Sequence, residues 1–272
     1  MADAAPLRSD AEVVSLAAEG GVNRRLVLSV EGWPGSVPGQ FVMLSPGALG
    51  AAERSDPLLP RPMAVYRQEP HDGGARVEIL FKIHGRGTAL LADARAGEKV
   101  RLVGPLGRGF ALPDAGETPL LVAGGTGIAS VYELAAALVS AGVPPVVLLG
   151  ARKAADLMGE ADFAALGGSL HVATEDGSRG ERGLVTALLE RELAAARRAR
   201  VYACGPTAMM KAVAGLCAAA DVPCVASLEN PMACGFGVCL GCAAPLVGGG
   251  FALVCRDGPV FDAARVDWEG LP

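Results

Sequence analysis

Four cysteines near the end of the chain have the spacing of thiolate ligands to a binuclear iron–sulfur cluster. Cys234, Cys239 and Cys242 form a C-x4-C-x2-C pattern, and Cys255 follows after twelve further residues. With this spacing, one tight turn supplies three thiolates and a separate segment supplies the fourth. Three glycines within the turn allow left-handed backbone conformations, so that N–H groups can point at the sulfur atoms. The pattern therefore predicts a 2Fe-2S cluster bound by these four cysteines.

Two other uses of cysteine compete with this interpretation. Structural zinc sites usually contain paired C-x2-C knuckles, and this stretch contains only one such pair. Disulfides are disfavoured because the total of seven cysteines is odd and because no basic segment followed by an apolar run, typical of a secretory signal, opens the sequence. Zinc remains the main alternative to iron and sulfide.

The composition indicates a globular chain that neither binds nucleic acid nor spans a membrane. Its 272 residues, 51% of them hydrophobic, suffice for two domains and a small third module. A net charge of −5 without a basic cluster argues against nucleic acid. The long uncharged run Leu134–Ala151 contains Gly142 and two prolines, which favour a helix end, a turn and a strand over a membrane span. We expect a cytoplasmic protein, since free cysteines suit a reducing compartment.

The first third of the chain has the alternation of antiparallel strands. Leu26, Leu28 and Val30 fall on one side of a strand, and the segment Val77–Ile83 shows the same period of two. Glycines and prolines separate such runs from residue 10 to about residue 112. The pattern predicts a small antiparallel β-barrel.

Three stretches of this region attract attention. Arg61–Tyr66 opens an apolar strand with an arginine, which could equally be a solvated residue on an edge strand. Phe81–Thr88 runs through Gly-x-Gly-Thr into the helical pattern Ala89–Leu91, so that free N–H groups could bind phosphate. The alternative for that turn is an ordinary helix start with Thr88 as N-cap. Gly104–Gly107 is expected to form a tight turn after a strand.

Strand and helix patterns alternate after a linker at residues 113–118. A helix from residue 128 places apolar residues on one face, and short apolar strands recur on either side of it. This alternation predicts a doubly wound parallel sheet with helices on both faces. The five strands that we expect are Leu120–Ala123, Val146–Leu149, Leu170–Ala173, Arg200–Ala203 and Cys224–Ser227.

Turns at the carboxyl ends of these strands are candidates for nucleotide binding, because ligands of open parallel sheets gather there. The first turn contains Gly124, Gly125, Thr126 and Gly127; it reads G-x-G-x-x-S as far as Ser130 and is an incomplete dinucleotide fingerprint, compatible also with a simple strand-to-helix turn.

Two later turns belong to the same edge of the sheet. The third strand is followed by Glu175 and Asp176, and the fourth by Cys204, Gly205 and Pro206. Cys204 could also be merely a small buried hydrophobe.

In their order, the Arg-Pro strand, the Gly-x-Gly-Thr turn and the Gly-Pro-Leu-Gly turn resemble the flavin domain of the ferredoxin–NADP reductase superfamily. The resemblance implies that FAD is bound with its pyrophosphate at Arg61, Gly87 and Thr88. It implies an isoalloxazine site built from Pro62, Met63, Ala64, Leu80, Phe81 and Lys82. Ala64 departs from the family, which usually has a serine or threonine there, and this puts side-chain assistance to hydride transfer in doubt.

The same resemblance assigns the second domain to nicotinamide. Cys204 would face the nicotinamide as a catalytic residue, beside Gly205 and Pro206. Glu175 and Asp176 stand where members that prefer a 2′-phosphate tend to have serine and arginine, which favours NAD over NADP, although Arg152 and Lys153 lie nearby in the sequence.

The final segment narrows the resemblance. It has about forty residues, which is too short for a complete ferredoxin domain, and it ends in Cys-x-Asp-Gly-Pro-Val-Phe after the cluster turn. Over nearly its full length the chain resembles the electron-transfer subunit family of class 1B dihydroorotate dehydrogenases. The motifs that carry this resemblance are Glu175-Asp-Gly-Ser-x-Gly-x-x-Gly183, Cys204-Gly-Pro-Thr-Ala-Met and Met232-Ala-Cys-Gly-x-Gly-x-Cys-x-Gly-Cys242.

This resemblance implies an oxidoreductase subunit with FAD, one 2Fe-2S cluster and NAD, working with an FMN-containing catalytic subunit in a tetramer of two plus two. Electrons from dihydroorotate would pass from that FMN through the cluster and FAD to NAD+, in pyrimidine biosynthesis. We expect a flavin domain at 1–113, an NAD domain at 118–228 and a cluster module at 229–272. Two rivals remain: a subunit of an NADH-dependent ferredoxin–NADP reductase or sulfide dehydrogenase complex, and a non-enzymatic zinc-bearing binding module.

Overall fold

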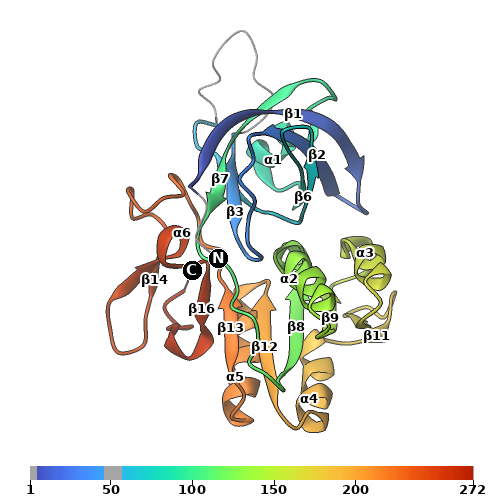
Figure 1. Ribbon diagram of the computed structural model, residues 1–272. Coiled ribbons are helices and arrows are strands. Elements are labelled where there is room, and N and C mark those ends of the chain that lie inside the picture. The colour runs from blue at the N-terminus through green and yellow to red at the C-terminus, as the bar shows by residue number, and fades with distance from the viewer. Residues whose placement is uncertain (1–4, 46–56, 272) are drawn as a thin grey trace.

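The computed structural model describes residues 5–45 and 57–271. Its first part is a curled sheet of seven antiparallel strands in the order β4-β3-β7-β1-β2-β6-β5, which agrees with the predicted barrel (Figure 1). The elements are β1 (Leu7–Ala18), β2 (Asn23–Glu31), β3 (Phe41–Leu44), β4 (Arg61–Ala64), β5 (Arg67–His71), β6 (Gly74–Lys82), α1 (Gly85–Ala92) and β7 (Lys99–Leu106).

The alternation of apolar residues in β2 and β6 explains how this sheet closes over a core. Leu26 and Leu28 lie opposite Ile79 and Val77 in the antiparallel register, and all four side chains are fully buried. The intervening residues face outward, as the period of two requires.

The prediction of a tight turn over Gly104–Gly107 is wrong, because most of this segment belongs to strand β7. Strand β7 continues to Leu106, which pairs with Phe41, and the chain turns only at Gly107. Gly104 is needed for another reason, because a Cβ there would lie 2.7 Å from a methyl group of Val42. The glycine therefore permits close packing within the sheet.

The second part is a parallel sheet that contains all five predicted strands. Its order is β11-β10-β9-β8-β12-β13-β16, so it is larger than the expected five-stranded sheet by one strand at each edge. The parallel strands are β8 (Thr118–Gly124), β9 (Val146–Ala151), β10 (Ser169–Thr174), β11 (Glu181–Arg182), β12 (Ala199–Cys204) and β13 (Cys224–Ser227). The helices between them are η1 (Gly125–Gly127), α2 (Ile128–Ser140), η2 (Ala154–Asp156), α3 (Glu160–Ala165), α4 (Val185–Ala195) and α5 (Thr207–Ala219).

Helices cover both faces of this sheet, as a doubly wound fold requires. Leu120 and Val122 of β8 pack with α4 and α5, whereas Leu121 and Ala123 pack with α2 and α3. The second of these cores also includes residues of the antiparallel sheet, so that α2 and α3 lie between the two sheets (Figure 1). Within residues 5–45 and 57–271, every helix is too short or too polar to traverse a lipid bilayer.

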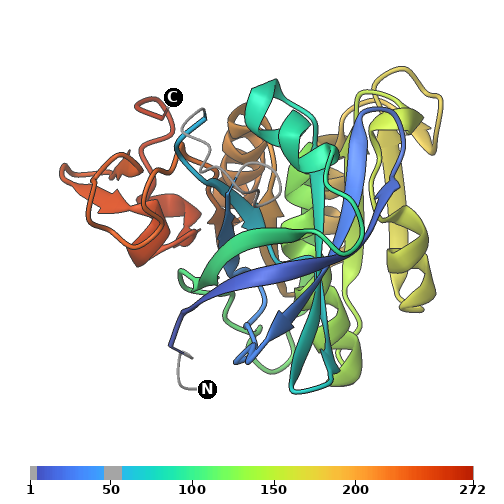
Figure 2. The same ribbon diagram turned by 90° about the horizontal axis from the view of Figure 1, so that it is seen from above.

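The last segment is small but is attached to the parallel sheet. It contains β14 (Ala243–Pro245), β15 (Phe251–Leu253), α6 (Val254–Asp257), β16 (Val260–Asp262) and η3 (Ala263–Arg265). Strand β16 pairs antiparallel with β13 and thereby covers an edge that the sequence pattern left open. Seen from above, the segment lies on the opposite side of the molecule from α3 (Figure 2).

An ion-pair network joins the two large sheets on the side of α3. Asp162 of α3 accepts hydrogen bonds from Arg25 at 2.6 Å and from the Tyr66 hydroxyl at 2.7 Å, and its other oxygen lies 3.0 Å from Arg67. Burial acts against ionisation of Asp162, but these partners outweigh it and lower the pKa of its carboxyl group. The network stabilises the folded chain at neutral pH.

Asp162→Asn is expected to lower the free energy of unfolding by about 1–2 kcal/mol, since it removes the charge that the two arginines share while the side chains are only partly exposed. The pKa of Asp162 is lowered in the fold, so its contribution is present above the unfolded value and is lost as the pH falls through the folded value. The free energies of unfolding of the wild type and the variant, measured with urea, should therefore differ less below about pH 4 than at pH 7.

The matched control is Asp10→Asn, which removes a surface carboxylate 3.2 Å from Arg101. We expect it to change stability by less than about 0.5 kcal/mol. Equal effects of the two substitutions would contradict a special role for Asp162.

Candidate active site and cluster loop

A cavity of about 440 Å³ lies where the antiparallel sheet meets the carboxyl ends of the parallel strands. One wall comes from β4 and β6, and the other comes from the start of α2 and the segment after β13. The residues predicted to bind FAD that line this cavity are Arg61, Pro62, Met63, Ala64, Leu80, Phe81, Lys82 and Thr88. Stretches that are far apart in the sequence are therefore brought to one site.

The ninth predicted residue, Gly87, lies directly against Arg61. A Cβ at Gly87 would be 2.6–2.7 Å from three atoms of the Arg61 guanidinium, so only glycine allows this approach. The guanidinium is also tied to the carbonyl oxygen of Leu59 at 2.6 Å. Because Gly87 belongs to the first turn of α1, a fixed cation stands beside the free N–H groups of a helix N-terminus, a combination suited to an anion such as a pyrophosphate.

The alternative in which Thr88 is the N-cap of α1 is wrong, and phosphate binding at Thr88 stays a prediction. His84, not Thr88, occupies the N-cap position of α1. The buried Thr88 hydroxyl accepts a hydrogen bond from the His84 N–H at 2.6 Å and lies 2.8 Å from the His84 carbonyl oxygen. This side chain fixes the turn that presents the helix N-terminus to the cavity.

The apolar wall of the cavity is formed by neighbouring strands. Leu80 and Phe81 are buried and point into different cores, while Ala64 pairs with Phe41, another cavity residue. Ala64 offers no hydroxyl group to a ligand, in agreement with the departure noted in the sequence. Lys82 is half-exposed, and its ammonium lies 3.7 Å from Asp156.

Two predicted nucleotide turns meet at the ends of the adjacent strands β8 and β12. A Cβ at Gly127 would lie 2.4 Å from the backbone carbonyl of Cys204, and one at Gly205 would lie 2.9 Å from the carbonyl oxygen of Gly124. The glycines are therefore required for the close approach of the two turns. Thr126 lines the cavity beside them, and Pro206 precedes the first residue of α5.

Cys204 lies behind the cavity wall and does not line it. The residue is fully buried, its thiol is 3.4 Å from the carbonyl oxygen of Ser227, and burial raises the pKa of the thiol. Ser227 and Ser130 separate it from the cavity as lining residues. The catalytic role of Cys204 stays a prediction.

Glu229 is an acidic residue that lines this cavity and that the sequence analysis did not predict. The Glu229 carboxylate lies 3.4 Å from the Thr126 hydroxyl and 4.0 Å from the Cys204 sulfur. Desolvation by the surrounding protein raises the pKa of Glu229, and the hydrogen bond from Thr126 opposes that shift. Glu229 follows β13 and reaches the site only because β13 lies beside β12. A local sequence pattern gives no signal of that adjacency.

Other cavity residues also escaped the sequence analysis, and several of them come from the segment that leads to the cluster loop. The complete set is Gly39, Phe41, His84, Ala129, Ser130, Ser227, Leu228, Glu229, Asn230, Pro231, Met232 and Pro259.

Glu175 and Asp176 lie outside the cavity, beyond β9 at the end of β10. Asp176 accepts hydrogen bonds from the Ser178 N–H at 2.9 Å and the Ser178 hydroxyl at 2.6 Å, and these bonds lower the pKa of Asp176. Its own N–H donates to the carbonyl oxygen of Arg152. The turn thus keeps two carboxylates at one edge of the sheet, with Arg152 in the adjoining loop.

NADH is expected to reduce the bound flavin at least about tenfold faster than NADPH, because these carboxylates would repel an added phosphate. Stopped-flow measurement of flavin bleaching with either nucleotide tests this. The double substitution Glu175→Gln with Asp176→Asn should narrow the preference, since it removes charge but leaves an acceptor for Ser178. Asp221→Asn, which removes a carboxylate at the opposite ends of the strands, is the control and should leave the preference for NADH unchanged. Faster reduction by NADPH would contradict the charge argument.

The cluster loop, residues 234–242, carries three of the four predicted cysteines and lies against Cys255 of α6. The four thiols form two pairs. The sulfur atoms of Cys242 and Cys255 lie 3.2 Å apart, and the Cys234 thiol interacts with that of Cys239. Partial burial acts against ionisation of Cys234, but N–H groups of the loop and the Cys239 thiol lower the pKa of Cys234 to about 6. All seven cysteines are free.

The loop suits a binuclear cluster, in which each iron takes two thiolates. The Gly237 N–H donates to the Cys255 sulfur at 3.1 Å, and the Cys255 N–H points at Cys242 at 3.4 Å. Backbone donors aimed at thiolates are typical of iron–sulfur sites. Across the part of the chain that the structure describes, no three His, Cys, Asp or Glu side chains surround a single metal-ion position.

The cluster loop borders the cavity. A Cβ at Gly235 would lie 2.5 Å from the Met43 side chain and 3.0 Å from Leu106, so the loop packs on β3 and β7. Met232, two residues before the first cysteine ligand, lines the cavity itself. The predicted cluster and flavin sites are therefore neighbours.

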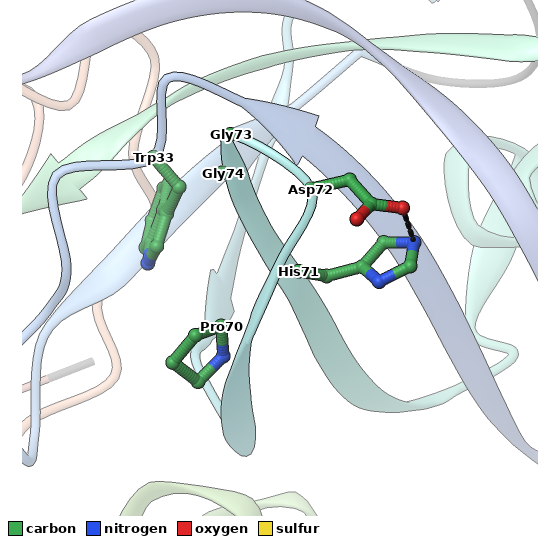
Figure 3. Close-up of a pocket in the computed structure, with 6 residues that line it drawn as sticks. All are labelled: Trp33, Pro70, His71, Asp72, Gly73 and Gly74. Atoms are coloured by element: carbon green, nitrogen blue, oxygen red, sulfur yellow. Dashed lines mark ion pairs between the residues drawn. The ribbon is translucent and has the colours of Figure 1, made fainter.

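A second hollow, of about 600 Å³, lies at the turn between β5 and β6 (Figure 3). It is lined by Trp33 and by the hairpin residues Pro70–Gly74, and the His71 ring lies 3.3 Å from the Asp72 carboxylate. It contains none of the predicted site residues. The smaller cavity is therefore the candidate active site.

A curled antiparallel sheet with a phosphate turn, a doubly wound parallel sheet with nucleotide turns and a four-cysteine loop define an oxidoreductase of the ferredoxin-reductase type. Residues 121–215 match the family described as "Oxidoreductase NAD-binding domain", and residues 229–267 match "Iron-sulfur cluster binding domain of dihydroorotate dehydrogenase B". The chain belongs to the family of dihydroorotate dehydrogenase B (NAD(+)) electron transfer subunits. These matches confirm the predicted iron–sulfur cluster and NAD as cofactors, and the boundaries of the three domains stay predictions.

Curated relatives support the family over most of the chain. The electron transfer subunit from Desulforamulus reducens is 38% identical over 86% of this chain and 88% of its own length. The electron transfer subunit from Bacillus caldolyticus is 41% identical over 84% of this chain and 86% of its own length.

Solved structures agree with the fold. One described in work on flavin-based electron bifurcation by NADH-dependent reduced ferredoxin–NADP oxidoreductase has a TM-score of 0.82 and 29% identity, covering 100% of this chain and 93% of that one. The ferredoxin reductase of carbazole 1,9a-dioxygenase has a TM-score of 0.68 over 80% of this chain and 67% of that one. Its 21% identity shows a shared fold alone.

Proposed function

We propose that the chain is the electron-transfer subunit of an NAD-dependent dihydroorotate dehydrogenase in pyrimidine biosynthesis, and that it connects the FMN of a catalytic partner with NAD+. The observation that carries this proposal is the cavity, which Thr126 of the first nucleotide turn lines on one side and Met232, just before the cluster loop, lines on another. FAD and a 2Fe-2S cluster, when bound, would supply the exchange between single electrons and a hydride.

The residues around the cavity have separate tasks in this proposal. Arg61 and the N-terminus of α1 would hold the FAD pyrophosphate, and the wall from Met63 to Ala64 with Leu80 would exclude water from the isoalloxazine. The turns at Gly124–Gly127 and Gly205–Pro206 would hold the NAD nucleotide, and Cys204 lies at the end of the same strand edge. We retain the boundaries 1–113, 118–228 and 229–272 for the three modules.

The cluster loop also offers a docking surface for the partner subunit. Three of its side chains are apolar and exposed: Phe236 at 55%, Val238 at 73% and Leu240 at 62%. Exposed apolar side chains that are contiguous in a loop mark protein interfaces, and here they would bring the partner's FMN close to the cluster ligands. We infer a cytoplasmic tetramer of two plus two subunits.

Val238→Glu is expected to prevent stable association with the catalytic subunit, because it places a charge in the centre of an apolar contact. Affinity capture of the tagged chain from extract of the source cells should recover an FMN protein, and the complex should oxidise dihydroorotate with NAD+. Val143→Glu, an exposed valine after α2, is the matched control and should leave capture intact. Capture of a different iron–sulfur flavoprotein would favour the rival below.

The rival is a subunit of an NADH-dependent ferredoxin–NADP oxidoreductase, to which the structure with a TM-score of 0.82 relates. Its 29% identity is lower than the 38–41% found for the two dihydroorotate dehydrogenase B subunits above. The first function is therefore preferred.

A further inference from the structure

An arginine lies across the cluster loop, next to the last cysteine ligand. The methylene groups of Arg256 pack on Gly237, where a Cβ would be 3.0 Å from the Arg256 Cδ and 3.3 Å from its Cβ. The N–H of the same Gly237 donates to the Cys255 sulfur at 3.1 Å. The guanidinium is thus held on the outer side of the turn that wraps the thiolates, and its side chain remains 59% exposed.

The guanidinium is held in place by a carboxylate that is itself anchored. Asp257 accepts from Arg256 Nε at 3.0 Å and from Nη2 at 3.2 Å, and it also accepts from the Leu253 N–H at 2.8 Å. These hydrogen bonds fix the guanidinium beside the turn that carries the thiolates.

The field of this arginine reaches the ligands. Arg256 directly follows Cys255 in the chain, and its methylene groups lie on the glycine whose N–H donates to the Cys255 sulfur, so its charge is held beside that ligand. Interaction of this kind is mutual, because a cation that is stabilised by thiolates stabilises negative charge on them equally.

We propose that Arg256 raises the reduction potential of the cluster held by Cys234, Cys239, Cys242 and Cys255, and so acts as a positioning residue for electron entry. A cluster with four thiolates gains a further negative charge on reduction, and a nearby cation favours the more negative form. This inference rests on the proposed 2Fe-2S site. It concerns the energy of the electron on that site and leaves the identity of the partner open.

The test is a redox titration of the isolated full-length chain, purified anaerobically, with the reduced cluster followed by electron paramagnetic resonance. Arg256→Gln keeps the methylene groups that cover Gly237 but removes the charge, and it should shift the midpoint potential to a more negative value. Arg256→Lys keeps the charge and should leave the potential near that of the wild type. Arg191→Gln removes an equally exposed, carboxylate-paired arginine on α4 and is the matched control.

Ionic strength provides an independent readout. Because Arg256 is exposed, the shift in Arg256→Gln should shrink at 1 M salt, where charges are screened over a few ångströms. An unchanged potential in Arg256→Gln, or an equal shift in Arg191→Gln, would overturn the role of Arg256 while leaving the cluster assignment intact. Absence of a cluster signal in the wild type would overturn both this inference and the proposed cluster site.

Discussion

Substitution of Cys239 by serine is expected to abolish the iron–sulfur cluster. Cys239 is the partner of Cys234 in one of the two thiol pairs, and a serine hydroxyl is not a thiolate ligand at neutral pH. The wild-type chain, purified without oxygen, should contain about two irons and two acid-labile sulfides. The variant should lose both, together with the visible absorption of the cluster, while FAD remains bound at its own cavity.

Cys217→Ser is the matched control for this prediction. Cys217 lies buried on α5, away from the cluster loop, and should be replaceable without loss of iron or sulfide. One zinc per chain without sulfide in the wild type would contradict the cluster and favour the structural-zinc alternative. Loss of iron in both variants would show that the assay reports unfolding instead of ligand removal.

Loss of the cluster is also expected to uncouple the two halves of electron transfer. Thr126 of the first nucleotide turn lines the cavity on the side of the parallel sheet, whereas the cluster loop packs on β3 and β7 and carries three exposed apolar side chains. A route from the partner to NAD+ therefore needs the cluster loop, but a route from NADH to FAD does not. Cys239→Ser should abolish transfer from dihydroorotate to NAD+ and keep the reduction of bound FAD by NADH.

Reconstitution with the FMN subunit measures both activities. The isolated wild-type chain should reduce an artificial acceptor with NADH and should not oxidise dihydroorotate, because the proposed function assigns the pyrimidine site to the FMN subunit. Addition of the partner should restore the coupled reaction for the wild type alone. Coupled turnover by the cluster-free variant would refute the proposed order of electron transfer.

Several features could be predicted from the sequence because they depend on local patterns. The cysteine spacing singled out the four residues that the fold brings together in two pairs, since one turn can present three thiolates and a second segment the fourth. Alternation in β2 and β6 predicted the antiparallel sheet, because a half-buried strand repeats every second residue. The five parallel strands were also found where expected, since short apolar runs between helical patterns have few other uses in a globular chain.

Other features were decided only by the tertiary structure. Glu229 reaches the cavity because β13 lies beside β12, and β16 joins the sheet because β13 would otherwise be an open edge. The expected turn at Gly104 is strand because its glycine serves packing against Val42.

The position of Arg256 over Gly237 likewise follows from the fold of the loop. Spacing along the chain determines which groups can share one turn. Which groups from different segments face one another depends on strand order and packing, and these arise only when the whole chain is folded.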